Sequence, residues 1–353
     1  MILVTGPTGH LGSSVVDMLL SQNEEVRLFV LPQERLRALH EWPLCDIESG
    51  DIRSEEDVSR AIAGCDTVLH VAGMVSISNG SAEWSKLKAV NVIGTRNVVN
   101  GCLAHSVKRM VYVSSIHAMV EPPKGTTIQE DLDFRPEMMN DAYSKSKSMA
   151  SVEVQKGIAR GLDAVMVFPS GMIGPKDTKP SQTGGIISHI AHKLEKTKKE
   201  PRRMFCFNGA YDFVDVRDVA KGVVLAMRIG RKAQGYILSG HKMSIPDIYH
   251  ATARFKEKQI KLVMAPLLLV RLAAKICEDF CRLVRKAPLF TPVALDVLAS
   301  NSNICSEKAK RELGYTKRPF EETIADTVSW FESGEIFAKG RKKLRWRMRQ
   351  AVN

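Results

Sequence analysis

The sequence lacks any pair of cysteines at metal-binding or redox spacing. Its seven cysteines are scattered, with no CxxC pair and no Cys/His run of the kind that binds zinc. They are Cys45, Cys65, Cys102, Cys206, Cys277, Cys281 and Cys305. An odd, dispersed set argues against a disulfide scaffold or a metal site and favours a reducing compartment. Cys277 and Cys281, four residues apart on one predicted helix face, are expected to be core thiols.

A long hydrophobic run is also missing. The longest apolar stretch, around residues 265–274, is interrupted by Arg271 and followed by Lys275, whereas a bilayer span needs about 20 apolar residues. The first residues, 1–6, have the pattern of a buried strand and leave no room for a signal peptide. No internal repeat of fixed period is visible. We therefore expect a cytoplasmic protein without a transmembrane helix.

The composition is that of an ordinary globular protein, with 353 residues of which 44% are apolar and 25% charged. It excludes a disordered or collagen-like chain, and the length allows two cores. The formal net charge of +12 is partly terminal, because residues 339–349 contribute seven positive charges. Such a tail is either solvated or attached peripherally to an anionic membrane surface. Nucleic-acid binding is not expected, since no recognition motif accompanies the charge.

Short β-branched runs alternate with segments of helical period through the first half of the chain. The predicted strands are residues 2–4, 26–30, 67–71, 109–114 and 164–168, and the predicted helices are residues 11–20, 55–63, 83–104 and 142–160. This alternation predicts an α/β fold with a doubly wound parallel sheet of the Rossmann type.

After Pro169 the pattern changes to a loop-rich stretch that is charged between Lys193 and Arg203. Strands at 211–216 and 235–238, separated by a helix at 219–228, then rejoin the sheet, and from Pro246 the pattern is mainly helical. We therefore predict a dinucleotide-binding domain over residues 1–170, rejoined by about 209–240. A smaller, mainly helical substrate-binding lobe would comprise 171–208 and 241–335, followed by the basic tail 336–353.

Three glycines, Gly6, Gly9 and Gly12, lie where the first predicted strand turns into the first predicted helix. The first permits a tight turn, the second lets backbone N–H groups approach a pyrophosphate, and the third allows the helix to pack closely on the strand. Glycines in this context predict a dinucleotide site at the start of the helix.

Tyr143 and Lys147 are four residues apart, so they share one face of the predicted helix 142–160. Ser114 and Ser115 end the strand before it, at the sheet edge where ligands of doubly wound sheets bind. A nearby ammonium favours the phenolate, so we expect Lys147 to lower the pKa of Tyr143 toward a range useful for proton transfer.

Together these motifs resemble those of the extended short-chain dehydrogenase/reductases, within the NAD-dependent epimerase/dehydratase superfamily. The branch they resemble contains dihydroflavonol reductases and 3β-hydroxysteroid dehydrogenases, and the resemblance runs from Ile2 to about Phe331. It covers the glycine motif, the Tyr-x-x-x-Lys pair and the two serines. Further matches are Gly50-Asp51, His70-Val-Ala-Gly73, Asn91-Val-Ile-Gly-Thr95, residues 169–175, residues 213–220, residues 308–315 and Trp330-Phe331.

The resemblance implies an NAD(P)-dependent enzyme that interconverts an alcohol and a ketone by hydride transfer. Tyr143 would move the proton, Lys147 would bind the nicotinamide ribose, and Ser115 would hold the carbonyl oxygen. The implied cofactor-binding residues lie in the loops that follow the strands and in the flanking helix. They are Gly6, Thr8, Gly9, His10, Leu11, Gly12, Arg35, Asp51, Ile52, Val71, Ala72, Gly73, Asn91, Ser114, Pro169, Gly171 and Met172.

The choice between NADP and NAD depends on the residues after the second strand. Leu31-Pro32 stand where NAD enzymes of this kind carry an acid and NADP enzymes an arginine. Arg35, and less directly Arg37, is placed to reach a 2′-phosphate, whereas Glu34 is placed to bind a free ribose. We favour NADP and keep NAD as the alternative.

The substrate is expected to be a small molecule, with His117, Met74 and Gly174 as candidate contacts. Apolar positions at helical spacing in residues 264–284 favour a steroid- or flavonoid-like alcohol or ketone, and the same helix could touch a membrane. The resemblance also implies a homodimer through the helices 83–104 and 142–160.

Two alternative functions remain open. An NAD-retaining nucleotide-sugar epimerase or dehydratase would use the basic stretch 193–203 to bind a diphosphate. A catalytically silent dinucleotide sensor is the other alternative, and the presence of Tyr143, Lys147 and Ser115 argues against it.

Overall fold

The structure is a computed structural model that describes residues 1–76, 81–178, 180–196, 201–283 and 292–333. The predicted basic tail, 336–353, lies outside the described residues, as does the membrane contact expected of residues 339–349. No helix among the described residues has the length and apolar character that would let it cross a bilayer.

Seven parallel strands form the main sheet, in the order β10-β6-β5-β4-β1-β2-β3. They are β1 (Ile2–Thr5), β2 (Val26–Val30), β3 (Asp46–Ser49), β4 (Thr67–His70), β5 (Arg109–Val113), β6 (Ala164–Pro169) and β10 (Gly235–Leu238). The sequence order reverses between β1 and β4, which is the point where ligands of doubly wound sheets bind. The predicted fold class is confirmed.

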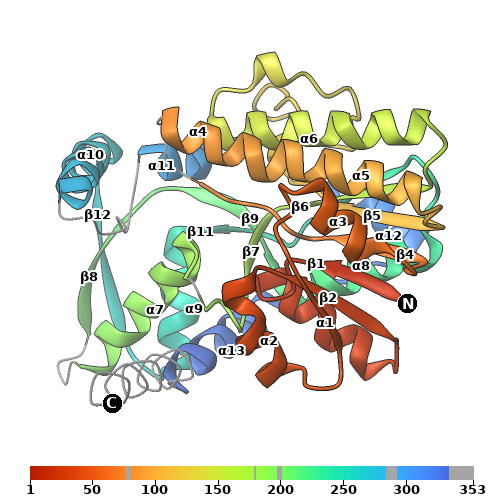
Figure 1. The fold of residues 1–353 in the computed structure, drawn as a ribbon. Coiled ribbons are helices and arrows are strands. Elements are labelled where there is room, and N and C mark those ends of the chain that lie inside the picture. Colours follow the sequence, from red (N-terminus) through yellow and green to blue (C-terminus); the bar gives the residue numbers. More distant parts are fainter. Residues whose placement is uncertain (77–80, 179, 197–200, 284–291, 334–353) are drawn as a thin grey trace. The chain divides into compact units, whose positions relative to one another are not determined.

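Helices cover both faces of this sheet (Figure 1). On one face α1 (His10–Ser21) packs against α8 (Val216–Ile229), and on the other α5 (Gly94–Ala104) packs between α3 (Glu55–Ile62) and α6 (Ala142–Ala159). The shorter α2 (Arg35–Glu41) adjoins β3, and α12 (Glu307–Leu313) adjoins α8 and β10.

Burial on both faces explains why these strands are apolar at nearly every position. Leu28, Leu69 and Val111 belong to the core cluster that α1 and α8 cover. The alternating residues Val68 and Met110 are also fully buried, although they point to the opposite face. Strands of a parallel sheet are covered on both sides, so they are continuously hydrophobic rather than alternating.

The chain divides into two compact units, each made of several segments. Unit 1 comprises Met1–Met172, Tyr211–Lys242 and Asp296–Lys317, and unit 2 comprises Ile173–Ala210, Met243–Leu295 and Arg318–Asn353. A three-stranded sheet of order β11-β9-β7 is formed by β7 (Gly171–Ile173), β9 (Ala210–Asp215) and β11 (His241–Ser244). The assignment of nucleotide binding to residues 1–170 and of substrate binding to the smaller lobe stays a prediction.

Unit 2 contains a helical group and a two-stranded parallel ribbon. The helices α7 (Gln182–Glu195), α9 (Ile245–Phe255) and α13 (Phe320–Glu332) pack together, and α9 also packs on the ribbon of β8 (Arg202–Phe207) and β12 (Ile260–Ala265). The remaining helices are α10 (Leu267–Leu283) and α11 (Pro292–Ala299).

The structure differs from the sequence-based expectations at several elements. The predicted helix 83–104 is divided into α4 (Ser81–Leu87), a π-helical segment Lys88–Ile93 and α5. The stretch expected to be a charged loop holds the end of α7 and the start of β8, and β12 lies in the segment expected to be helical. Short 3₁₀ turns span Pro32–Glu34, Ile116–Ala118 and Pro136–Met138. Cys277 is half-buried rather than a core thiol, and the side chain of Cys281 lies outside the description.

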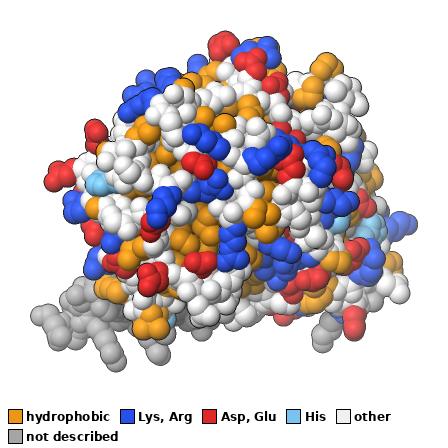
Figure 2. All heavy atoms as spheres, turned by 90° about the vertical axis from the view of Figure 1, so that its right-hand side faces the viewer, with side chains coloured by type: hydrophobic (Ala, Val, Ile, Leu, Met, Phe, Trp, Pro, Cys, Tyr) orange, Lys and Arg blue, Asp and Glu red, His pale blue; other side chains and the backbone are white. Residues whose placement is uncertain are grey.

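Charges of both signs are interspersed with apolar side chains on the face of the molecule shown in Figure 2. Several of the described cations are paired with acids, for example Arg60 with Glu48 and Arg231 with Glu312. The positive excess of the sequence therefore does not form a single continuous patch on this face.

Truncation of one buried strand residue should measure how much the main core contributes to stability. Leu69→Ala removes a fully buried side chain of β4, so we expect the free energy of unfolding to fall by about 2–5 kcal/mol. The control, Leu36→Ala, changes an exposed side chain of α2 and should alter it by no more than about 0.5 kcal/mol. Urea denaturation followed by circular dichroism measures both values, and equal effects would contradict this account of the core.

Candidate functional site

The glycine loop between β1 and α1 approaches the end of β4 so closely that no side chain fits. Gly6 has a φ of +68°, and a Cβ placed on it would lie 2.8 Å from the Cα of Ala72. A Cβ on Gly12 would collide with the carbonyl oxygen of Gly6. Gly9 is the N-cap of α1 and donates its N–H to the same oxygen at 3.2 Å. The loop therefore leaves the helix N-terminus uncovered by side chains, as an approaching phosphate requires.

A row of buried polar groups fixes β1 against β4. The Thr5 hydroxyl accepts a hydrogen bond from the Ala72 N–H at 3.0 Å and shares another with His70 Nδ1 at 2.9 Å. The other ring nitrogen of His70 lies 2.9 Å from the hydroxyl of Thr95 on α5. Burial, with a smaller contribution from the charge of Lys147, lowers the pKa of His70 to about 3. The imidazole is therefore neutral and acts as a structural bridge.

Asn91 fixes the segment that follows β4. It lies in the π-helical segment, and its amide oxygen accepts from the Met74 N–H at 2.7 Å. Its amide nitrogen donates to the Met74 carbonyl and to the Ser146 hydroxyl, both at 2.9 Å. A Cβ on Gly73 would lie 3.6 Å from the Asn91 amide oxygen and 3.6 Å from the Lys147 ammonium. Gly73, Asn91 and Lys147 are therefore brought together.

Lys147 is buried on α6, and its ammonium is directed at the end of β5. The ammonium donates to the carbonyl oxygen of Val113 at 2.8 Å and lies 4.9 Å from the centre of the Tyr112 ring. Burial lowers the pKa of Lys147 to about 7. A group with this pKa exchanges its proton near neutral pH, which an exposed lysine does not do.

Tyr143 lies about one helical turn before this lysine on α6 and interacts with Ser115. Burial raises the pKa of Tyr143, although a side-chain hydrogen bond with Ser115 acts in the opposite direction. The expectation that Lys147 lowers the pKa of Tyr143 is therefore wrong for this structure, because burial dominates and the ammonium is bonded to Val113 instead.

The two serines after β5 point in different directions. The Ser114 hydroxyl lies 2.8 Å from the hydroxyl of Ser151 on α6, and both side chains are buried. The Ser115 hydroxyl instead accepts the backbone N–H of His117 at 3.3 Å and interacts with Tyr143.

His117 extends the cluster toward β9. Its Nε2 lies 3.0 Å from the hydroxyl of Tyr211, and its ring is edge-on to Tyr143 with centroids 6.5 Å apart. Burial lowers the pKa of His117, so the ring is neutral at pH 7. Tyr211 was not predicted as a site residue, because the sequence marks it only as the start of a strand.

A buried carboxylate organises the loop after β6. Asp212 accepts the hydroxyl of Ser170 at 2.5 Å and the N–H of Gly240 at 2.7 Å. Burial raises the pKa of Asp212 despite these bonds. A Cβ on Gly171 would lie 3.1 Å from the Asp212 carbonyl oxygen, so the chain after Pro169 passes close to β9. Asp212 also went unpredicted, and its position in a short apolar strand gives little signal.

The residues expected to meet the adenosine part of a cofactor are bonded mainly to their own neighbours. Thr8 donates to Glu34 at 2.6 Å, and the Arg35 guanidinium donates to the Ile47 carbonyl and the Ser49 hydroxyl, both at 3.0 Å.

The residues after β3 are held in the same way. The side chain of Asp51 is held by Arg53, whose hydrogen bonds are the main reason that its pKa is lowered. Ile52 is buried, and its carbonyl accepts from Asn97 at 3.1 Å.

For the remaining residues that were predicted to bind the cofactor or the substrate, the structure gives their burial and their place in the fold. Leu11 is buried in the core, His10 and Val71 are half-buried, and Met172 packs against the core cluster. Gly174, a candidate substrate contact, has a φ of +142° and belongs to the segment that opens unit 2. It is therefore not among the residues that unit 1 brings together.

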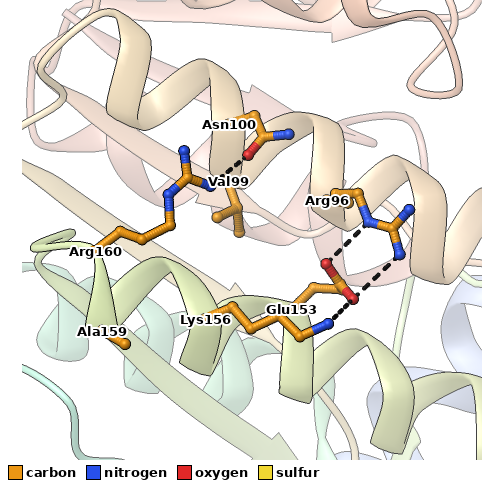
Figure 3. A pocket seen from close by; sticks show the side chains of 7 residues that line it. All are labelled: Arg96, Val99, Asn100, Glu153, Lys156, Ala159 and Arg160. Carbon is orange, nitrogen blue, oxygen red and sulfur yellow. Dashed lines mark hydrogen bonds and ion pairs between the residues drawn. The ribbon is translucent and has the colours of Figure 1, made fainter.

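A separate hollow of about 500 Å³ lies on the outer side of α5 and α6 (Figure 3). Glu153 is central to it and accepts hydrogen bonds from Arg96 at 3.0 and 3.2 Å and from Lys156 at 2.9 Å. Arg160 donates to Asn100 at 2.8 Å (Figure 3). None of the predicted site residues lines this hollow. It lies on the two helices through which the sequence implied a homodimer, and that assembly stays a prediction.

Comparison with known proteins gives consistent results. The profile of the NAD dependent epimerase/dehydratase family matches residues 2–238. The chain is 31% identical to sterol demethylase protein B of Methylococcus capsulatus, over 95% of this chain and 99% of that protein. It is 30% identical to a putative dihydroflavonol 4-reductase of Synechocystis, over 94% of each chain.

Solved structures with the same fold include that of gox2253, which is 28% identical with a TM-score of 0.78. The alignment covers 95% of this chain and 99% of that one. The UDP-glucose 4-epimerase of Thermus thermophilus in complex with NAD is 22% identical with a TM-score of 0.72. The alignment covers 94% of this chain and 98% of that one, and at this identity the similarity concerns the fold alone.

The low pKa of Lys147 predicts how stability depends on pH. In the unfolded chain this lysine keeps its proton up to its ordinary pKa of 10.5, whereas in the folded chain it loses it near 7. Between these values the unfolded chain binds more protons, so the free energy of unfolding should rise with pH across this window. One pKa unit corresponds to about 1.4 kcal/mol. Across this pH window, the free energy of unfolding of the unmodified protein should therefore rise by about 2–4 kcal/mol more than that of Lys147→Met.

Urea denaturation at several values between about pH 7 and about pH 10 measures this difference. Lys145→Met is the matched control, because Lys145 is exposed on the same helix. The free energy of unfolding of this variant should depend on pH as that of the unmodified protein does. The same pH dependence in both variants would show that Lys147 keeps an ordinary pKa.

Proposed function

Because the chain belongs to the NAD-dependent epimerase/dehydratase family and is an NAD(P)-dependent oxidoreductase acting on CH–OH groups, we propose that it interconverts a secondary alcohol and a ketone. The proposed substrate is small and apolar, of the steroid or flavonoid type. One observation carries this proposal: Tyr143 and Lys147 share one face of α6, where Tyr143 interacts with Ser115 and the Lys147 ammonium is buried at the end of β5.

The glycine loop fits a dinucleotide. Gly6 and Gly12 leave no room for side chains, and Gly9 presents the N-terminus of α1. Together with the segment of Val71, Ala72 and Gly73, this loop borders the point where the strand order reverses. A bound nicotinamide supplies the hydride or accepts it.

The residues around β5 would handle the proton and orient the substrate. In the reducing direction, the Tyr143 hydroxyl gives its proton to the carbonyl oxygen of the substrate as the C–H bond forms. Ser115 holds the same oxygen by a hydrogen bond, which favours charge developing on it. Lys147 would bind the nicotinamide ribose through its buried ammonium. In the oxidising direction the phenolate accepts the proton of the alcohol.

The apolar substrate class is supported by the relatives and by the residues near Tyr143. The relatives include sterol demethylase protein B, a putative dihydroflavonol 4-reductase and a 3beta-hydroxysteroid-dehydrogenase/decarboxylase of Arabidopsis thaliana, 28% identical over 80% of this chain. Next to Tyr143 stand the rings of His117 and Tyr211, which are neutral and suit a hydrophobic ligand. We propose His117 and Met74 as substrate contacts, and Gly174 with them.

The alternative is an NAD-retaining nucleotide-sugar epimerase or dehydratase. It is favoured by the fold shared with solved epimerase structures such as the UDP-glucose 4-epimerase of Thermus thermophilus. The two functions differ in stoichiometry, because an epimerase regenerates its cofactor within each turnover. A change in nicotinamide absorbance equal to the product formed supports the oxidoreductase, whereas turnover without such a change supports the epimerase.

Replacement of Tyr143 tests the proposed proton transfer. Tyr143→Phe removes the hydroxyl and should lower kcat by about 10²–10⁴-fold while leaving NADPH affinity unchanged, since the phenol does not hold the cofactor. Steady-state assays with apolar ketones and calorimetric binding measure the two effects. Tyr236→Phe is the control, because that buried tyrosine of β10 bonds Glu312 instead and should keep kcat. Full activity in the Tyr143 variant would refute the mechanism.

We propose NADP as the cofactor, with the Arg35 guanidinium close to the 2′-phosphate. Glu34 is an argument for NAD, because an acid after the second strand suits a free ribose. Its carboxylate, however, accepts a hydrogen bond from the Thr8 hydroxyl. Arg35→Ala should weaken NADPH binding by about 10-fold and leave NADH binding unchanged, since an arginine–phosphate pair contributes about 1–3 kcal/mol.

Arg228→Ala is the control, because Arg228 on α8 pairs with Glu24 before the start of β2, away from the loop that follows this strand. Calorimetry with both cofactors measures these affinities. Tighter binding of NADH than of NADPH by the unmodified protein would overturn the choice of NADP.

A further inference from the structure

The helix α10 of unit 2 carries an apolar stripe that faces solvent. Leu268, Leu272 and Ile276 recur every four residues, and 78%, 58% and 63% of their surfaces are exposed. Leu269 is 59% exposed on the same side of the helix. Residues at this spacing are neighbours on a helix surface, so the four side chains form one continuous stripe. Scattered exposed leucines are ordinary, whereas a contiguous set indicates a binding surface.

The opposite side of α10 is the side that contacts the protein. Ala274 is buried, and Leu267, Val270 and Cys277 are half-buried. Across the described part of the chain, α10 makes no extensive packing contact with another named helix or strand. The helix is therefore held along one edge, with its apolar stripe directed outward.

Cations border this stripe. Arg271 follows Leu268 by three residues, and Lys275 follows Leu272 by three, so each lies at the edge of the stripe, and both side chains are exposed. Residues 258–277 contain four cations and no acid, and the first acids after them are Glu278 and Asp279. An apolar stripe with basic residues along one edge is complementary to a membrane surface that carries anionic lipids.

We infer that the apolar stripe of α10 inserts into the surface of a bilayer that contains anionic lipids, with Arg271 and Lys275 at the headgroups. The helix lies in the plane of the surface and does not cross it, because 17 residues extend only about 25 Å and include charged side chains. This inference goes beyond the proposed reaction, in which no residue of α10 takes part.

The same charges disfavour the alternative, in which a second copy of this chain covers the apolar stripe. An antiparallel symmetric contact centred on the stripe, at Leu272, would bring the cations Arg271 and Lys275 of one copy close to those of the other, which is unfavourable. An anionic bilayer has no such cost, since the same cations meet negative headgroups.

Vesicle flotation of the full-length protein tests the inference. The unmodified protein should bind vesicles of phosphatidylcholine with phosphatidylserine, and bind more weakly to phosphatidylcholine alone. The triple variant Leu268→Ser/Leu272→Ser/Ile276→Ser should lose at least about 30-fold in affinity, because it removes the inserted side chains. Arg271→Gln/Lys275→Gln should lose about 10-fold on the anionic vesicles only, and added salt should have the same effect.

The matched control is Leu36→Ser/Leu39→Ser/Leu44→Ser, which removes three exposed leucines of unit 1 and should bind as the unmodified protein does. A variant without residues 336–353 separates the contribution of the basic tail. The inference would be overturned if this deletion abolished vesicle binding while the α10 triple variant still bound as the unmodified protein does. A stripe-dependent dimer, seen by light scattering, in a protein that does not bind vesicles would also overturn it.

A second measurement locates the contact independently of affinity. A tryptophan introduced by Leu269→Trp keeps the stripe apolar, and its fluorescence should shift to shorter wavelength and be quenched by brominated lipids. The same substitution at Leu36 should show neither effect. Equal quenching at both positions, or none at Leu269 in vesicle-bound protein, would contradict docking through α10.

Discussion

The close approach of β1 to β4 is the constraint on which the rest of unit 1 depends. Gly6 must lack a side chain because the backbone of Ala72 occupies the space, and Thr5 bonds both that backbone and the ring of His70. The neutral imidazole then reaches Thr95 on α5. A strand, the neighbouring strand and a covering helix are thus fixed to one another by buried polar bonds, which become costly if any partner is lost. This arrangement therefore fixes the positions of the loops that follow these strands.

Burial governs the electrostatics of the cluster at the end of β5. It lowers the pKa of Lys147 and raises that of Tyr143, so both groups are shifted toward their neutral forms. At neutral pH the Tyr143 phenol is uncharged and Lys147 is only partly protonated, and groups in such a low-dielectric environment are sensitive to any new charge nearby. The negative charge of a bound dinucleotide would favour the ammonium of Lys147, and an ammonium would in turn favour the phenolate of Tyr143. The expectation from spacing alone, that the lysine already lowers the pKa of the tyrosine, omitted the cost of desolvation.

Features that depend on local contacts could be predicted from the sequence, whereas those that depend on distant contacts could not. The glycine loop, the Tyr143–Lys147 pair and the strand–helix alternation are all short-range patterns, and the parallel sheet follows from them. Asp212 and Tyr211 meet Ser170 and His117 only through the three-dimensional fold, so no local pattern marks them. The strands β8 and β12 pair across a long interval that includes α8 and α9, and β8 begins with two arginines, which hid it within a charged stretch. The position of Arg35 after the second strand could be predicted, whereas the contacts with β3 that orient its guanidinium could not.

The segmented composition of unit 1 has a consequence for synthesis of the protein. The last strand of its sheet, β10, is separated from its neighbour β6 by the first segment of unit 2, Ile173–Ala210, and by β9 and α8, and α12 follows much later still. As the chain leaves the ribosome, β6 is an edge strand with unsatisfied backbone groups until Gly235–Leu238 emerges. The growing polypeptide therefore passes through a stage in which an apolar sheet edge is open to other chains, and a chaperone that covers this edge would be of use at that stage.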